Sequence, residues 1–443
     1  MLCAAISRCS LLSRKVYDMR LSFTETIKSA LPIVKRLREH HFEAFFVGGA
    51  VRDSILGLSI KDVDIATSAR PEQVLALFER CIPTGLQHGT ITVIIDGLAY
   101  EVTTFRQESA YEAHRKPESV RYITELDGDL LRRDFTMNAM ALAEDGELYD
   151  PYGGVQDLQR KTLRSVGDPD ARFQEDALRM LRAVRFIGVY QLTPAYRTWR
   201  AISRHRALLK FIAMERVQVE LDKMLAGAAP QRALHYAAAS GLLFHLKEPF
   251  LEKTELSLKE ADRSAKTTLK FSRLHMLEAV DLRWAALAIG LQLSVEATQQ
   301  ALLVLRFSNS RSKTISSLVA IHKEILNNLE LEDEHKLKAA WLNIIIRFGK
   351  QPASDWLEVI RTLQASTQSL SSGLLTRLDS WLAAMTISSL KQLKISGRDL
   401  SSHLKREAGP WVSERLNHLL LSVALGELEN DKHVLLQQAS LMD

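Results

Sequence analysis

Apolar and polar residues follow two different periods along this chain of 443 residues. Up to about Lys161, short apolar runs of the kind that form strands alternate with stretches whose apolar residues recur at helical spacing. After Lys161 the strand signals nearly vanish, and helical spacing continues almost to the end. The pattern therefore predicts an α/β part followed by an all-α part.

Several elements of the first part follow from its apolar runs and breakers. We expect helices over 22–41 and Pro71–Arg80, and strands over Ala44–Val47, Asp62–Ile65, His88–Ile95 and Ala99–Phe105. Asp96-Gly97, between the last two strands, is typical of a tight hairpin turn. The charge-rich segment Arg106–Pro117 has little periodicity and is expected to be a mobile loop, and Leu131–Ala139 is expected to begin a helix.

The chain is too long for one hydrophobic core, so we divide it into modules. The turn Asp150–Gly154 closes the α/β part, and breaks in the helical pattern lie near Gly227–Pro230 and Ser366–Gly373. Residues 1–18 carry three basic side chains and no acid before Asp18, and we expect them to form a disordered arm. The segments that follow are 19–158, 159–227, 228–366 and 367–443.

Composition indicates the kind of compartment and partner but not the reaction. Lys and Arg number 58 against 53 Asp and Glu, a balance that permits a polyanionic partner without requiring one. Cys3, Cys9 and Cys81 show neither metal-ligand nor disulfide spacing, which favours a reducing compartment. No run reaches the roughly 18 apolar residues of a membrane-spanning helix. We therefore expect a cytoplasmic protein without a membrane partner; the weaker alternative is a mitochondrial one, from the basic arm.

The most informative stretch runs from Phe45 to Thr67. An apolar strand meets Gly48-Gly49, and the following residues, Ala50–Leu56, have the composition of a short helix. A strand, a glycine turn and a helix together bring backbone N–H groups close to a phosphate. The stretch therefore predicts a triphosphate site, although Gly-Gly alone is more often an ordinary turn.

Two carboxylates follow this turn. Side chains alternate along a strand, so Asp62 and Asp64 share one face while Val63 and Ile65 point into the core. A divalent cation relieves the repulsion between such carboxylates, and hard oxygen ligands favour Mg²⁺. The pair therefore predicts two-metal phosphoryl or nucleotidyl transfer. Glu101 on a neighbouring strand is a candidate third carboxylate, and an exposed strand glutamate is the alternative.

Arginines form the remaining candidate site. Arg132 and Arg133, next to Asp134, are either a surface ion-pair cluster or a clamp for phosphate or ribose. On a helix over Phe173–Phe186, one apolar stripe opposes Asp176, Arg179, Arg182 and Arg185. Asp176 and Arg179 are spaced to form an ion pair at i, i+3. The alternative is that they present one acceptor and one donor to a nucleobase.

Taken together, these motifs resemble those of the DNA-polymerase-β-like nucleotidyltransferases, and more closely a class II CCA-adding enzyme, a tRNA nucleotidyltransferase, of the bacterial type without an HD domain. The resemblance covers Ala44 to about Gly227 and returns at Gly397–Trp411. The family's five motifs stand in order: Gly48-Gly49 through Asp62 and Asp64; Arg132-Arg133-Asp134; Asp150–Gly154; Glu175-Asp176 through Arg179 and Arg182; and Glu215-Arg216.

The resemblance implies a function and a set of site residues. It implies template-independent addition of C, C and A to the 3′ end of tRNA from CTP and ATP, with Mg²⁺ on Asp62 and Asp64. It implies a head, a neck with a nucleotide-selecting helix, a body and a tail, with tRNA along the last three. Nucleotide contacts are implied for Gly49, Arg52, Arg133, Asp176, Arg179, Arg182 and Arg185, with Gly48, Glu101, Arg132, Asp134 and Glu175 as further candidates.

Other functions remain open at this point. A bacterial poly(A) polymerase shares the head and the template-like helix, and relatives that add only CC or only A exist. An inactive RNA-binding module is the alternative from another class, and the presence of both Asp62 and Asp64 argues against it. A P-loop enzyme is excluded because no G-x-x-x-x-G-K-[ST] occurs. The oligomeric state is left open between a monomer and a homodimer.

Overall fold

The structure is a computed structural model that describes residues 16–108, 111–112, 116–117, 120–252, 254–255, 271–328, 333–364 and 370–442. The chain divides into two compact units. One runs to Glu220 and includes Ser240–Lys247; the other holds Leu221–Ala239 and the residues from Glu248 onward. The described helices include none with the length and apolar composition needed to cross a lipid bilayer.

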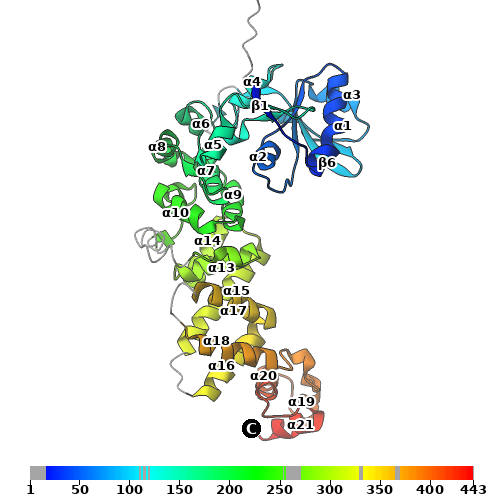
Figure 1. Ribbon diagram of the computed structural model, residues 1–443. Helices are drawn as coiled ribbons and strands as arrows, with labels where there is room; N and C mark the ends of the chain where they lie inside the picture. The colour runs from blue at the N-terminus through cyan, green and yellow to red at the C-terminus, as the bar shows by residue number, and fades with distance from the viewer. Residues whose placement is uncertain are drawn as a thin grey trace, which may run out of the picture. The chain divides into compact units, whose positions relative to one another are not determined.

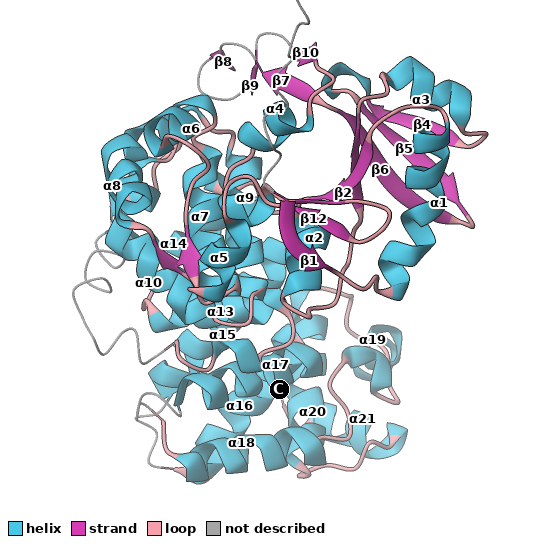
Figure 2. Ribbon diagram, turned by 45° about the horizontal axis from the view of Figure 1, so that its top comes forward, coloured by secondary structure: helices cyan, strands magenta, loops and turns pink. Residues whose placement is uncertain are grey.

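A mixed sheet forms the first part of the N-terminal unit, as the sequence predicts (Figure 2). Its strands are β1 (Val16–Arg20), β2 (Ala44–Val47), β3 (Asp64–Thr67), β4 (Cys81–Gly85), β5 (Thr90–Ile95), β6 (Leu98–Thr104), β11 (Ala141–Leu142) and β12 (Glu147–Tyr149). They lie in the order β1-β12-β11-β2-β3-β6-β5-β4. Strand β3 is antiparallel to β2 and parallel to β6, so it lies inside the sheet.

Helices cover this sheet because apolar side chains alternate along its central strands. Helix α1 (Glu25–Glu39) begins at Thr24, whose side chain accepts a hydrogen bond from the Ile27 backbone, and packs against β2. Helix α3 (Pro71–Leu77) lies beside α1 and contacts β5 and β6 (Figure 1). Along β2, Phe45 and Val47 join a buried cluster with Leu126 and Leu130 of α4 (Leu126–Leu131). The sheet is therefore buried where β2 and β3 meet.

The hairpin between β5 and β6 has the conformation that its sequence predicts. Asp96 and Gly97 both have positive φ, at 51° and 78°, as a type I′ turn requires. The segment expected to be a mobile loop instead contains three short strands, β7 (Arg106–Glu108), β8 (Tyr111–Glu112) and β9 (Lys116–Pro117). Strand β8 pairs with β9, and β7 pairs with β10 (Val120–Tyr122), which follows the segment. Residues 109–110 and 113–115 of this segment lie outside the described residues.

Two further expectations are corrected. The last residues of the expected disordered arm belong to β1, which pairs with β12 and so gains backbone hydrogen bonds; residues 1–15 lie outside the described residues. No helix begins at Leu131. That residue ends α4, and only the short 3-10 helix η2 (Thr136–Asn138) follows. Phe135 between them is extended because it bridges to Ser165.

The rest of the N-terminal unit is mainly helical. It contains α2 (Gly49–Ile55), α5 (Gly154–Gln159), α6 (Pro169–Glu175), α7 (Leu178–Val189), α8 (Tyr196–His205), η3 (Arg206–Phe211) and the first part of α9 (Met214–Ala226). The single helix expected over Phe173–Phe186 is two helices, α6 and α7. Asp176 separates them, with φ −136° and ψ 105°. Its side chain accepts a hydrogen bond from the Leu178 backbone, which caps the start of α7.

The C-terminal unit is all-α where it is described, as expected. Its helices are α10 (Pro230–Ser240), α13 (Val280–Gly290), α14 (Val295–Val304), α15 (Asn309–Asn328), α16 (Glu334–Phe348), α17 (Lys350–Gln364), α18 (Ser372–Ala384), α19 (Gly397–Leu404), α20 (Pro410–Leu425) and α21 (Lys432–Ser440). Trp341 and Trp356 are fully buried between α16 and α17, with ring centroids 5.6 Å apart. A second cluster around Leu400, Leu419 and Leu435 joins α19, α20 and α21. The division into body and tail stays a prediction.

Candidate active site

The glycine turn after β2 is placed against the second aspartate. Gly48 has φ 70° and ψ −128°, a conformation that favours glycine. A Cβ atom on Gly48 would lie 3.1 Å from Arg133 Nη1 and 3.5 Å from Asp64 Oδ2, and one on Gly49 would lie 3.4 Å from Arg52 Nη2. The absence of side chains thus lets the backbone approach these charged groups closely.

Sheet register brings the candidate carboxylates together. Asp64 pairs with Val47 across β2 and with Glu101 across β6. Val63 and Ile65 are buried, as the alternation predicts, and Asp62 is exposed just before β3. Burial raises the pKa of Asp64; Arg133 opposes this, but the Glu101 and Asp62 carboxylates raise the pKa further. Negative charge is therefore concentrated at the start of β3.

Such a donor set fits a hard divalent cation. Carboxylate oxygens that repel one another in a partly buried site are stabilised by a positive ion between them. Within the described ranges, no three Asp, Glu, His or Cys side chains form a group that could hold a metal by themselves. Asp62 and Asp64 would therefore supply part of the coordination shell, and water and substrate phosphates the remainder.

Arg132 and Arg133 are held by a buried acid that the sequence analysis did not single out. Asp129 is 1% exposed and accepts from Arg132 at 2.8 Å and Arg133 at 3.2 Å. Burial alone would raise the pKa of Asp129, but the two arginines lower it below its usual value. The spacing i, i+3 and i, i+4 on the end of α4 was the signal that could have identified Asp129.

The expected ion pair between Asp176 and Arg179 is not formed. Arg179 is 8% exposed and donates to Glu175 at 2.5 Å and to the Arg132 carbonyl at 2.8 Å. Asp176 instead accepts from Arg216 of α9 at 2.8 Å. Asp176 has extended backbone angles at the break between α6 and α7, so its side chain no longer follows the helical pattern, although its carbonyl still accepts from the Arg179 backbone at 3.0 Å.

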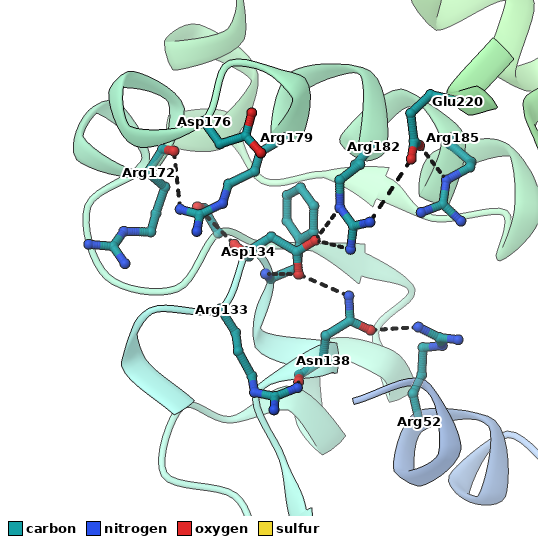
Figure 3. A network of polar contacts seen from close by, with 12 residues as sticks. Arg52, Arg133, Asp134, Asn138, Arg172, Asp176, Arg179, Arg182, Arg185 and Glu220 are labelled. Carbon is teal, nitrogen blue, oxygen red and sulfur yellow. Dashed lines mark hydrogen bonds and ion pairs between the residues drawn. The ribbon is translucent and has the colours of Figure 1, made fainter. Parts of the chain in front are cut away.

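The two following arginines are held by Asp134 and Glu220, and Glu220 contacts both, at 4.0 Å from Arg182 (Figure 3). Arg182 forms an ion pair of 2.6 Å with Asp134, and Arg185 one of 2.7 Å with Glu220. Burial would raise the pKa of Asp134, but Arg182, Asn138 and Arg179 together lower it to about 2. Asp134 is therefore a carboxylate at neutral pH. Glu220 was missed because only the folding of α9 against α7 reveals its contact with Arg185.

Arg52 is buried and has several partners. It donates to Asp53 at 2.9 Å through two nitrogens and to Asn138 Oδ1 at 2.5 Å. Its guanidinium carbon lies 4.4 Å from the centroid of the Tyr190 ring. Burial raises the pKa of Tyr190, and despite the opposing effect of Arg52 it reaches about 12 with the help of Asp53. Arg52 thus connects the glycine turn with the end of α7.

Three parts of the chain match models of known families. Residues 44–164 match the model of the poly A polymerase head domain, and residues 191–254 that of the probable RNA and SrmB-binding site of polymerase A. Residues 276–439 match the model of tRNA nucleotidyltransferase domain 2, putative.

Proteins of similar sequence cover nearly the whole chain. The CCA-adding enzyme of Geobacillus thermodenitrificans is 38% identical over 407 residues, which are 91% of this chain and 94% of that protein. The CCA-adding enzyme of Bacillus velezensis is 38% identical over 404 residues, which are 91% of this chain and 95% of that protein. The crystal structure of the Bacillus stearothermophilus CCA-adding enzyme in complex with CTP is similar with a TM-score of 0.79 and 34% identity, over 95% of this chain and 98% of that one. On this evidence the chain belongs to the family of CCA-adding enzymes.

Proposed function

We propose that this chain adds C, C and A to the 3′ end of tRNA from CTP and ATP and releases pyrophosphate, with Asp62 and Asp64 as ligands of Mg²⁺. The observation that supports it most is the register that sets Asp64 beside Glu101 and against the Gly48 turn. The chain that has this arrangement aligns over 91% of its residues with a curated CCA-adding enzyme.

The chemical step follows from these residues. The terminal 3′ oxygen of the tRNA forms a bond to the α-phosphorus of the nucleotide, the bond from that phosphorus to the pyrophosphate oxygen breaks, and the hydroxyl proton leaves to solvent. Bound Mg²⁺ would supply charge neutralisation for the attacking and leaving oxygens. Asp62 and Asp64 fix where that charge lies, and the bare backbone at Gly48 and Gly49 lets Arg133 and Arg52 approach the turn proposed to bind the triphosphate. Arg133, 16% exposed and held by Asp129, faces this side with positive charge.

Base selection is assigned to Asp176 and Arg179. Asp176 keeps acceptor capacity because an ionised carboxylate accepts several hydrogen bonds, and Arg179 carries five donors. Together they fit the amine and ring nitrogen of cytosine or adenine, whereas uracil and guanine place a carbonyl where the amine should be. Their contacts to Arg216 and Glu175 hold both side chains in place before a nucleotide arrives.

A basic surface on the N-terminal unit fits a tRNA backbone. Residues 195–214 contain no acid, and Arg197, Arg200 and Lys210 are exposed. Tyr196 beside them is 75% exposed and lies against Arg200. Positive side chains with an aromatic ring are typical of contacts to phosphates and unpaired bases. We assign this surface, together with basic residues of the C-terminal unit, to binding the tRNA acceptor arm.

The proposed cellular location rests on the organisms of the curated relatives, and the oligomeric state is open between a monomer and a homodimer. The curated relatives are bacterial, which favours a cytoplasmic location and gives the mitochondrial alternative no support. Sedimentation of the pure protein, alone and with tRNA, separates a monomer from a homodimer.

Product lengths test the proposed activity. A tRNA that ends at its discriminator base is offered CTP, ATP or both, with Mg²⁺. We expect two added nucleotides with CTP alone and three with both. A long A-tail would instead identify a poly(A) polymerase, and a stop after CC, or addition of A only to a tRNA ending in CC, would identify a partial enzyme. No extension under any condition would leave the inactive RNA-binding module.

A further inference from the structure

The side chain of Asn138 lies between two groups of residues with different expected tasks (Figure 3). One group is Arg52 on α2, shortly after the glycine turn that is proposed to bind the triphosphate. The other is Asp134 with Arg182, which lies on α7 one turn after Arg179 of the proposed base-selecting pair. The Asn138 amide accepts from Arg52 at 2.5 Å and donates to Asp134 at 3.0 Å. A single side chain therefore joins the two groups.

An amide is suited to this position because its two ends differ. Its oxygen accepts from a cation and its nitrogen donates to an anion, which neither a carboxylate nor an amine can do at once. All three side chains are nearly inaccessible: Arg52 is 7% exposed, Asp134 7% and Asn138 6%. Hydrogen bonds between charged and neutral groups are stronger and more directional in such surroundings than in water. A shift of one partner is therefore transmitted to the other.

The backbone of the same residue adds a third contact. The Asn138 carbonyl accepts from Arg133 Nη1 at 3.4 Å, and that nitrogen lies against Gly48. The short helix η2, which Asn138 ends, contacts α2. Asn138 thus contacts Arg133, which lies against Gly48, Arg52 on α2, and Asp134, the partner of Arg182 on α7.

We infer that Asn138 is a positioning residue that couples base selection at Asp176 and Arg179 to placement of the triphosphate at the glycine turn. When a base fits, Arg182 and Asp134 take up their correct positions. The Asn138 amide, which is bonded to Asp134, then holds Arg52 in its correct position as well. A base that does not fit disturbs the same chain of contacts and misplaces the α-phosphorus. The inference rests on the proposed function and adds a source of selectivity that lies outside the contacts to the base.

The competing explanation is that Asn138 only stabilises η2. Thr136 supplies a matched control, because it lies on the same short helix, is 2% exposed and donates to Asp157 at 2.7 Å without touching Arg52 or Asp134. Thr136→Val therefore removes the buried hydroxyl contacts of η2 to Asp157 and to the Arg164 carbonyl and leaves the Asn138 contacts in place. Any effect of Asn138 on selectivity beyond that of Thr136 comes from the coupling.

Two substitutions at Asn138 separate its two ends. Asn138→Leu has similar volume and removes both hydrogen bonds. Asn138→Asp keeps the acceptor for Arg52 but sets a second carboxylate against Asp134. We expect Asn138→Leu to raise the KM for CTP and to lower the CTP-to-UTP selectivity, each about tenfold, as the loss of a buried charge-assisted hydrogen bond predicts. Asn138→Asp should lower the selectivity by a similar factor and keep the KM within about threefold.

Steady-state kinetics on tRNA with CTP and with UTP measure the KM and the selectivity of each variant, and Tm measures its stability. Equal selectivity in wild type and both Asn138 variants would overturn the coupling, whatever their Tm. So would a loss of selectivity in Thr136→Val as large as in Asn138→Leu. If Asn138→Leu does not fold, Asn138→Ser, too short to bridge, takes its place. Product lengths of the wild type report the proposed function separately, so its failure is distinguishable from failure of the coupling.

Discussion

Arg216 on α9 donates to the carboxylate of Asp176 at 2.8 Å, so a residue 40 positions further along the chain holds the proposed base-reading acid. Arg179, which the sequence offers as the partner, is held by Glu175 instead. Asp176 also accepts from the Leu178 backbone, and the two contacts use different carboxylate oxygens. The orientation of Asp176 is thus fixed by one local and one distant donor.

Arg216→Ala should relax nucleotide selection without abolishing addition. The Leu178 contact still restrains Asp176, so we expect misincorporation of UTP and GTP to rise about fivefold, which corresponds to about 1 kcal/mol for one charge-assisted hydrogen bond near the surface. Arg216→Lys retains one donor and should lie between wild type and Arg216→Ala. Single-nucleotide addition with each of the four nucleotides measures this. An unchanged preference in Arg216→Ala would show that the contact is only structural.

Direct substitution of the pair should have larger and different effects. Asp176→Ala removes the acceptor, and each unpaired buried polar group costs roughly 1–3 kcal/mol, so discrimination of up to a few hundredfold against UTP and GTP should be lost. Arg179→Ala should lower C and A addition together, because both bases use that donor. Glu175→Ala removes the carboxylate that holds Arg179 but leaves its bond to the Arg132 carbonyl, so it should resemble a weaker Arg179→Ala. Unaltered preference for CTP and ATP in Asp176→Ala would exclude its role in reading the base.

The sequence predicted what depends on near neighbours in the chain. Alternation along a strand was enough to place Val63 and Ile65 inside, and the turn at Asp96-Gly97 follows from two residues whose backbone tolerates positive φ. The apolar stripe predicted over Phe173–Phe186 is fully buried as expected; its members are Phe173, Ala177, Leu181 and Val184. These features survive because no tertiary contact competes with them.

Contacts between distant segments could not be predicted. Asn138 meets Arg52 across 86 positions, and Arg185 meets Glu220 across 35; neither spacing carries a local signal. The helix break at Asp176 was missed for another reason. Asp is more favourable at a helix cap than in a helix interior. The apolar period nevertheless runs through the break at Asp176 without interruption, so the sequence predicted one continuous helix. The roles of the site residues stay predictions.

Asp62→Ala and Asp64→Ala should abolish nucleotide addition and leave the fold and tRNA binding nearly intact. Asp62 is exposed and Asp64 only partly buried, so neither supports the core. Asp96→Asn is a matched control, because it removes an exposed carboxylate from the same sheet at a turn that Asn tolerates. Primer extension, tRNA binding and Tm should be compared. Turnover near the wild-type rate in either alanine variant with Mg²⁺ present would contradict the metal assignment.

Glu101→Gln decides whether a third carboxylate serves the site. Glu101 raises the pKa of Asp64 from the neighbouring strand, so its charge reaches the proposed metal position. If it helps to hold the cation, the Mg²⁺ concentration for half-maximal activity should rise about tenfold, as one lost charged contact predicts. If Glu101 is only an exposed strand residue, the Mg²⁺ dependence should match the wild type.

Binding of tRNA should weaken strongly with salt. Each phosphate contact that releases a counterion steepens the dependence of the binding constant on salt concentration. Charge reversal at the basic surface, Arg197→Glu with Arg200→Glu, should lower affinity and reduce the salt slope by about two. Arg20→Glu, an exposed arginine on the sheet edge, is the control. Equal salt slopes in the charge-reversed and control variants would place the tRNA elsewhere.

His322 should lower the unfolding free energy of the C-terminal unit in mild acid. It lies on α15, its ring centroid is 6.3 Å from that of buried Trp356, and its Nδ1 has no hydrogen-bond partner among the described residues. Burial lowers the pKa of His322 from 6.5 to about 4. The folded state therefore favours the neutral ring, whereas the unfolded chain takes up a proton once the pH falls below about 6.5.

The sign and size of the effect follow from this difference in proton binding. The stability that neutral His322 provides is fully present above pH 6.5 and is lost progressively between pH 6.5 and 4, by about 2 kcal/mol at pH 5. His322→Gln has no proton to gain, so its unfolding free energy should fall less over this range. Denaturant unfolding of both proteins at pH 7.5 and 5 makes the comparison. Because every other titrating group, including His245 with its lowered pKa, is common to both, an identical pH dependence would show that His322 titrates normally in the folded chain.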